Sequence, residues 1–150
     1  LNPNIREDMV SFCKGIIAFY EKEYEKAQFL LLQVNEFNFE YHLNKETLLL
    51  KAFYLCQHRF FVSKLDTFKS YLRQNKQLNK DTRTVHHNFC KALKQLETIR
   101  KNIDFWKNKR LQPEKTQKQA ESFLIYLQSD KNIAEKSWLK EEFQILFDMK

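Results

Sequence analysis

Glycine and proline are nearly missing from this sequence, which has one glycine, Gly15, and two prolines, Pro3 and Pro113. Tight hairpins and phosphate-binding loops need glycine where φ is positive or where the backbone approaches a ligand closely. The sequence therefore has no P-loop and no dinucleotide-binding fingerprint, and it argues against an antiparallel sheet protein. It is instead rich in Leu, Lys, Glu and Gln, which favour helices. Its 150 residues fit one domain.

Long apolar runs and paired cysteines are also lacking. No stretch of about 18 apolar residues occurs, so the sequence predicts no membrane span. Cys13, Cys56 and Cys90 are far apart and form no C-x-x-C motif, which argues against a disulfide framework or a zinc site. We therefore expect a reducing, cytoplasmic setting. The first residues resemble no signal peptide and lack an initiator methionine, so we interpret the chain as a fragment of a longer protein, from which any targeting signal could be missing.

Apolar residues recur at helical spacing along most of the chain. The expected helices lie at about 5–22, 24–36, 44–57, 59–74, 81–108, 113–128 and 131–148. We expect a connection over 37–43 and helix caps at Asn44 and Asp81. The helix at 81–108 is the longest, and its apolar residues alternate at spacings of four and three as in a coiled-coil seam. The sequence thus predicts an all-α fold, in which α-α hairpins precede a long helix and two C-terminal capping helices.

One tripeptide occurs twice, because Ala18-Phe19-Tyr20 returns 34 residues later as Ala52-Phe53-Tyr54. Other apolar pairs with the same offset are Ile16 and Leu50, Leu31 and Leu65, and Val34 and Phe68. This period is that of the tetratricopeptide repeat, in which each unit is a helix-turn-helix. Residues 5–75 therefore resemble two tetratricopeptide-like hairpins.

The resemblance extends to the positions at which the helices of a tetratricopeptide unit come close and need small residues. Gly15 and Ala27 fit two of these positions in the first hairpin, and Tyr24 fits the aromatic position between them. The second hairpin has Leu49 and Phe61 at the small positions. The second unit is therefore a degenerate repeat, and we expect its helices to pack at a wider angle.

A second resemblance covers the middle of the chain. The stretch Tyr41-His42-x-x-Lys45-x-x-Leu48-Leu49-Leu50-Lys51-x-x-Tyr54, followed by Asp66-x-Phe68 and Tyr71-Leu72-Arg73, is similar to one in uncharacterised bacterial proteins with helical repeats. Ile133-Ala134 with Trp138-Leu139 resembles the closing helix of those proteins. This resemblance implies a fold and no activity.

The first helix of each tetratricopeptide unit builds the concave face of the array, and apolar residues left exposed there form a groove for a partner peptide or helix. The groove candidates in this sequence are Met9, Phe12, Ile16, Phe19, Tyr20, Phe53 and Tyr54. Some of them must pack between the two hairpins. The remainder would bind the partner.

Positive charge is concentrated in the middle of the chain. Residues 41–110 carry 16 basic and 5 acidic side chains, whereas residues 1–40 carry 4 and 7. The basic-surface candidates are His87, Lys91, Lys94, Lys101, Lys107, Lys109 and Arg110. The first four fall on one face of the long helix, roughly 150° from its apolar seam. Two interpretations stay open: a solvated outer face, or a surface for phosphate backbones or an acidic partner.

Residue types and spacing offer no catalytic or metal site. Adjacent helical residues such as His86 and His87 point about 100° apart and cannot chelate one ion from one face. The carboxylates at 21, 23 and 25 have the pattern of a solvated helix face. No constellation joins a nucleophile, its base and an oxyanion stabiliser. We therefore expect a protein that is not an enzyme and has no cofactor and no metal.

The sequence favours a non-enzymatic protein–protein interaction or scaffold module of unknown pathway, which binds a partner peptide or helix in an apolar groove. The alternative is sequence-independent binding of RNA or DNA through the basic middle segment.

Overall fold

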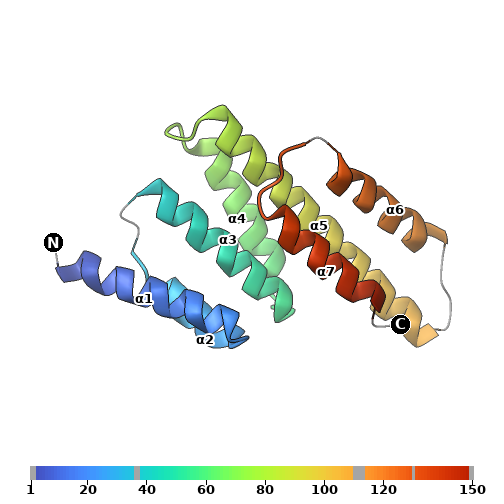
Figure 1. Ribbon diagram of the computed structural model, residues 1–150, viewed down its shortest axis with the longest axis horizontal. Coiled ribbons are helices and arrows are strands. Elements are labelled where there is room, and N and C mark those ends of the chain that lie inside the picture. The colour runs from blue at the N-terminus through green and yellow to red at the C-terminus, as the bar shows by residue number, and fades with distance from the viewer. Residues whose placement is uncertain (1–2, 36–37, 110–113, 130, 149–150) are drawn as a thin grey trace. The chain divides into compact units, whose positions relative to one another are not determined.

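The computed structural model describes residues 3–35, 38–109, 114–129 and 131–148 (Figure 1). In this part of the chain there are seven α-helices and no strand, so the prediction of an all-α fold is confirmed. The helices are α1 (Pro3–Tyr20), α2 (Tyr24–Leu32), α3 (Phe39–Leu55), α4 (Phe61–Gln74), α5 (Lys80–Lys109), α6 (Glu114–Gln128) and α7 (Lys136–Asp148). The chain divides into two compact units, Leu1–Gln77 and Leu78–Lys150.

The first unit consists of two helical hairpins, α1–α2 and α3–α4. The turn after α1 places Lys22 at φ 63°, with its amide bonded to the Phe19 carbonyl and the Glu23 amide bonded to the Ala18 carbonyl. The turn after α3 repeats this arrangement at Gln57, with φ 53°, and at His58. Both turns are therefore Schellman caps, which satisfy the last carbonyls of each helix and reverse the chain.

Helix α3 begins earlier than the sequence indicates. The expected cap was Asn44, after a connection over 37–43. In the structure the side chain of Asn38 accepts a hydrogen bond from the Tyr41 amide at 3.0 Å, and α3 begins at Phe39. Asn38 thus satisfies an unpaired amide of the first turn, and Asn44 lies inside the helix. Residue 37 lies outside the described residues.

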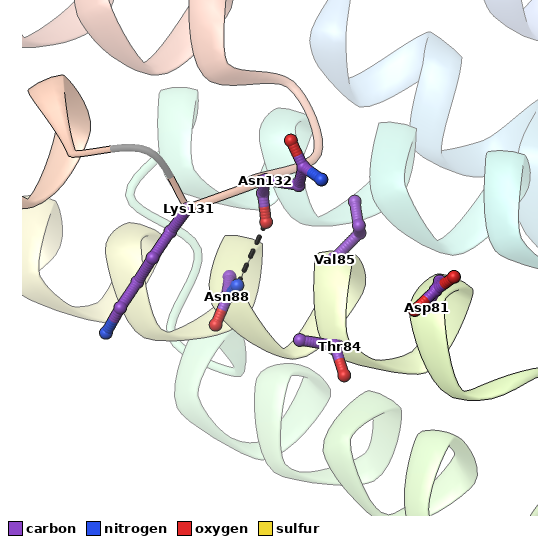
Figure 2. A pocket seen from close by; sticks show the side chains of 6 residues that line it. All are labelled: Asp81, Thr84, Val85, Asn88, Lys131 and Asn132. Carbon is purple, nitrogen blue, oxygen red and sulfur yellow. Dashed lines mark hydrogen bonds between the residues drawn. The ribbon is translucent and has the colours of Figure 1, made fainter.

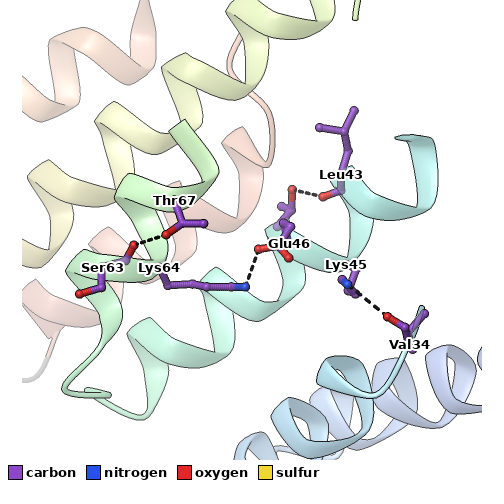
Figure 3. A network of polar contacts seen from close by, with 8 residues as sticks. Val34, Leu43, Lys45, Glu46, Ser63, Lys64 and Thr67 are labelled. Atoms are coloured by element: carbon purple, nitrogen blue, oxygen red, sulfur yellow. Dashed lines mark hydrogen bonds and ion pairs between the residues drawn. The ribbon is translucent and has the colours of Figure 1, made fainter. Parts of the chain in front are cut away.

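Polar side chains connect the helices of the first unit (Figure 3). The Lys45 ammonium of α3 donates to the Val34 carbonyl, which comes after α2 in the chain, at 3.3 Å. Glu46 of α3 pairs with Lys64 of α4 at 2.8 Å, and the Glu46 side chain is only 8% exposed. A buried carboxylate needs such a partner, because removing its charge from water has a high free-energy cost. These contacts fix how α3 packs between α2 and α4.

The second unit is built on the long helix α5, against which α6 and α7 both pack. Its buried residues include Cys90 and Leu93 beside the seam residues Phe89, Ala92 and Leu96. The buried face is therefore wider than the predicted seam, because two helices cover it. The cap of α5 is Asn79, whose side chain accepts from the Thr82 amide at 2.7 Å, and not the expected Asp81.

The chain between α6 and α7 runs along α5 without forming a helix. We expected a helix from residue 131, but α7 begins only at Lys136, after Glu135 at φ 58°. The Ala134 amide donates to the Val85 carbonyl at 3.2 Å, and the Asn88 side chain donates to the Asn132 carbonyl at 2.9 Å. These bonds hold residues 131–134 against the first turns of α5 in place of a helical turn.

A half-buried carboxylate in α7 makes the stability of the second unit depend on pH. Burial raises the pKa of Glu142 above its usual value, Glu141 raises it further, and Arg100 opposes both. An acid whose pKa is higher in the folded state stabilises the fold when protonated, and this contribution declines as the pH rises from about 4 through the folded pKa. We expect Glu142→Gln to raise the melting temperature slightly at pH 7, with the gain vanishing below about pH 4.

The matched control for this pH profile is Glu141→Gln on the exposed neighbouring position. It removes the same formal charge, but the carboxylate that it removes is exposed. The rise in melting temperature at pH 7 should therefore be smaller. A lower melting temperature for Glu142→Gln at pH 7 would mean that the attraction of Arg100 outweighs the cost of burial.

Candidate functional site

The groove candidates do not all face outward. Phe12, Phe19, Phe53 and Tyr54 are buried, and the Phe12 ring packs edge-on against Tyr41 of α3. Ile16 is half-buried. The Phe19 ring also contacts the Lys51 ammonium, 6.0 Å from the ring centroid. These side chains pack inside the protein, and of the seven candidates only Met9 and Tyr20 are exposed.

Helix α1 instead presents a row of exposed apolar side chains, and two of them, Met9 and Tyr20, are groove candidates. The exposed members are Met9, Val10, Cys13, Ile17 and Tyr20, which together we name the α1 strip. At about 100° per residue they lie within roughly 100° of the helix circumference. Val10 is 48% exposed, Ile17 is 56% exposed and Tyr20 is 74% exposed. The spacing of seven residues between Val10 and Ile17 is the sequence signal that could have identified this face.

The basic-surface candidates from His87 to Lys109 lie on α5. Lys91, Lys94 and Lys101 are exposed and His87 is half-buried. Lys101 pairs with Glu97 at 3.5 Å, so part of its charge is already neutralised. The side chains of Lys107 and Lys109 and the whole of Arg110 lie outside the described residues. Lys91 and Lys94, one helical turn apart, are thus exposed lysines of this face that are not paired with Glu97.

A third lysine joins this face from the chain between α6 and α7. Tyr126 of α6 has the Lys91 ammonium 5.2 Å and the Lys131 ammonium 5.4 Å from its ring centroid. The negative face of an aromatic ring attracts a cation by about 0.5–1 kcal/mol at an exposed site. One ring therefore contacts two ammonium groups. Tyr126 and Lys131 were not among the candidates, because nothing in the spacing of the sequence relates them to Lys91.

The hydroxyl of Tyr126 fixes the position of this ring. It donates to the Asn88 carbonyl of α5 at 3.4 Å. Burial raises the pKa of Tyr126 above its usual value, so the hydroxyl stays protonated and keeps its donor at neutral pH. The ring is thereby held against α5, and the two lysines are positioned by a contact that does not titrate near pH 7.

A cavity of about 480 Å³ opens beside Lys131 (Figure 2). It is lined by Asp81, Thr84, Val85, Asn88, Lys131 and Asn132. Four of these residues lie in order along the first turns of α5, and the other two come from the chain between α6 and α7. The lining residues carry a carboxylate, two amides and a hydroxyl, which can donate and accept hydrogen bonds, and the Lys131 side chain extends away from the other five residues (Figure 2).

The three cysteines lie in different environments. Cys90 is buried and Cys13 is exposed within the α1 strip. Burial raises the pKa of the Cys56 thiol, Glu25 raises it further, and the neighbouring Gln28 side chain opposes both. A raised pKa lowers the fraction of reactive thiolate. Among the described residues no three His, Cys, Asp or Glu side chains are grouped so that they could hold a metal ion.

Within the described parts of the chain, no helix has the length and apolar character needed to cross a membrane. Comparison with known proteins adds no further constraint: the chain matches no family model, no curated protein and no solved structure.

Proposed function

We propose that the protein is a non-enzymatic interaction module, of the tetratricopeptide-like type, that binds an amphipathic helix of a partner protein on the α1 strip. The observation that carries this proposal is the row of exposed apolar side chains on α1. The hairpin packing supports the repeat type, because Gly15 and Ala27 are both buried and Gly15 lies directly against Leu31. Three free thiols fit the reducing, cytoplasmic setting that we propose for it.

The dimensions of the α1 strip favour a helix as the partner. From Met9 to Tyr20 the strip extends about 16 Å along α1, which is three helical turns. Its width of roughly 100° equals that of the apolar stripe on an amphipathic helix. The exposed Arg6 lies within the strip by the same helical geometry. A partner helix with a carboxylate beside its apolar stripe would therefore fit both the apolar side chains and the charge.

Charge insertion into the strip tests this proposal. A display library of helical peptides should yield ligands with apolar residues at i, i+3, i+4 and i+7. Val10→Glu and Ile17→Glu should each weaken such a ligand at least about tenfold, because burying one such side chain contributes about 1.5–3 kcal/mol. The matched control is Val62→Glu on α4, since Val62 is 47% exposed and Val10 is 48% exposed. Affinities are measured by titration calorimetry.

Two results would contradict the proposal. One is the selection of no ligand, or of ligands that bind all three variants equally. The other is a wild-type dimer that Val10→Glu dissociates in sedimentation experiments, since a second copy would then occupy the strip.

A second candidate function is binding of a nucleic-acid backbone on α5. The observation that favours it is the pair of ammonium groups on the Tyr126 ring, together with the exposed Lys94. Phosphate contacts by lysines supply affinity without reading sequence. The test is the salt dependence of oligonucleotide binding, because each phosphate contact adds about 0.7 to the slope for a single strand.

A further inference from the structure

We infer that the cavity beside Lys131 is a subsite for one unpaired base of a single-stranded nucleic acid, whose phosphates lie on Lys91 and Lys131. This inference rests on the second candidate function and deepens it. It names the form of nucleic acid that the basic face of α5 would take, and it assigns a role to the cavity.

The first argument for this inference is that the cavity and the lysines are connected. Lys131 lines the cavity and also contacts the Tyr126 ring that Lys91 contacts. An anion bound by the Lys131 ammonium would therefore lie beside the residues that line the cavity. The group bonded to that anion enters the cavity, and in a nucleic acid this group is a sugar with its base.

The second argument is the order of charged side chains along α5. Asp81 and Asn88 both line the cavity and are seven residues apart, or about 10 Å along the helix. Lys91 lies one turn beyond Asn88. The cavity thus has a carboxylate toward one end and ammonium groups toward the other. A nucleotide has the matching polarity, because its phosphate is anionic and the exocyclic amino groups of its base donate to carboxylates.

The third argument is the size and the lining of the cavity. A volume of about 480 Å³ lies within the usual range of about 300–1,000 Å³ for sites that enclose a small ligand. Thr84 and Asn132 add groups that can hydrogen-bond to a base edge, and Val85 adds an apolar surface (Figure 2). Asn88 already donates to the Asn132 carbonyl, so part of this lining is held in place before a ligand binds.

A duplex cannot use such a cavity, because its bases are stacked and paired. An unpaired strand can turn one base out of the stack, as proteins that recognise single strands generally require. Electrostatics alone predicts the opposite preference, since a duplex has the higher charge density and the steeper salt slope. Preference for the single strand therefore distinguishes base entry from charge attraction.

The test compares three labelled probes of about 12 nucleotides, a single strand, its duplex and an abasic single strand, by fluorescence anisotropy with the full chain. The intact single strand should bind about tenfold more tightly than the abasic strand, and more tightly than the duplex. Thr84→Phe, which adds a bulky ring to the lining of the cavity, should lower affinity for the intact strand about tenfold and leave affinity for the abasic strand unchanged.

Ser122→Phe, on an exposed position of α6, is the matched control and should change neither affinity. If the intact and abasic strands bind equally, or the duplex binds more tightly, the cavity is not a base subsite although the basic face still binds nucleic acid. If no probe binds at low salt, both the subsite and the second candidate function are wrong.

Discussion

Replacing Gly15 with alanine is expected to destabilise the first unit by about 1 kcal/mol, although alanine is the better helix former. A β-carbon at this position would lie 2.8 Å from both Cγ and Cδ2 of Leu31. Leu31 is fully buried, so it cannot move aside without disturbing its neighbours. The overpacking cost of about 1–3 kcal/mol therefore exceeds the gain of about 1 kcal/mol in helix propensity. Urea unfolding monitored by circular dichroism measures the difference.

A double-mutant cycle isolates this contact. Leu31→Ala alone should cost about 2–5 kcal/mol, as for other buried leucines. In that background Gly15→Ala should become stabilising by about 1 kcal/mol, because the clash is gone and the propensity gain remains. The control background is Leu65→Ala, which removes the equally buried leucine 34 residues later. There Gly15→Ala should stay destabilising, and a stabilising effect in every background would contradict close packing of α1 on α2.

The helical hairpins of the first unit could be predicted because burial tracks the repeated residues. At an offset of 34 residues, Leu31 and Leu65 are both buried, as are Val34 and Phe68. The pair Leu31 and Leu65 depends only on which side of a helix faces the core, which apolar periodicity reports directly, whereas Val34 lies beyond the end of α2. The close contact at Gly15 was predictable for the same reason, since a lone glycine inside a helix indicates that another element lies close.

The residues at which α1 and α3 end could not be predicted from the repeated tripeptide. Tyr20 and Tyr54 are equivalent in the repeated tripeptide, yet Tyr20 is 74% exposed and Tyr54 is 2% exposed. In the structure, Phe19 and Tyr54 occupy the same position of the two Schellman caps, so the helix ends are offset by 35 residues and not by 34. One residue turns a side chain by about 100°, which moves Tyr20 from the core to the surface.

The candidate site in the second unit was only half predictable. Charge content and helical spacing identified Lys91 and Lys94, because both lie on one helix. Lys131 joins them through Tyr126, more than 30 residues along the chain from Lys91, and only tertiary packing creates that contact. The cavity likewise depends on where residues 131–134 bond to α5, and on their side these bonds use backbone groups that every residue carries.

Reversing the three lysines of this face is expected to have the largest effect on nucleic-acid binding. At about 0.1 M salt, each phosphate contact with a single strand contributes roughly fivefold to affinity through counterion release. Changing Lys91, Lys94 and Lys131 to glutamate should therefore lower affinity for a single strand about 100-fold and flatten the slope of log affinity against log salt by about 2–3. Lys101 is left unchanged, because it already pairs with Glu97.

The matched control is a second triple variant in which the exposed Lys115, Lys118 and Lys140 become glutamate. Each lysine-to-glutamate change alters the charge by two, so both variants lower the formal net charge from +7 to +1. If total charge alone drives binding, the two variants lose affinity equally and the face on α5 has no special role. If the face binds the backbone, the control keeps most of the affinity and most of the slope, because phosphates beyond about 10 Å are largely screened at this salt concentration.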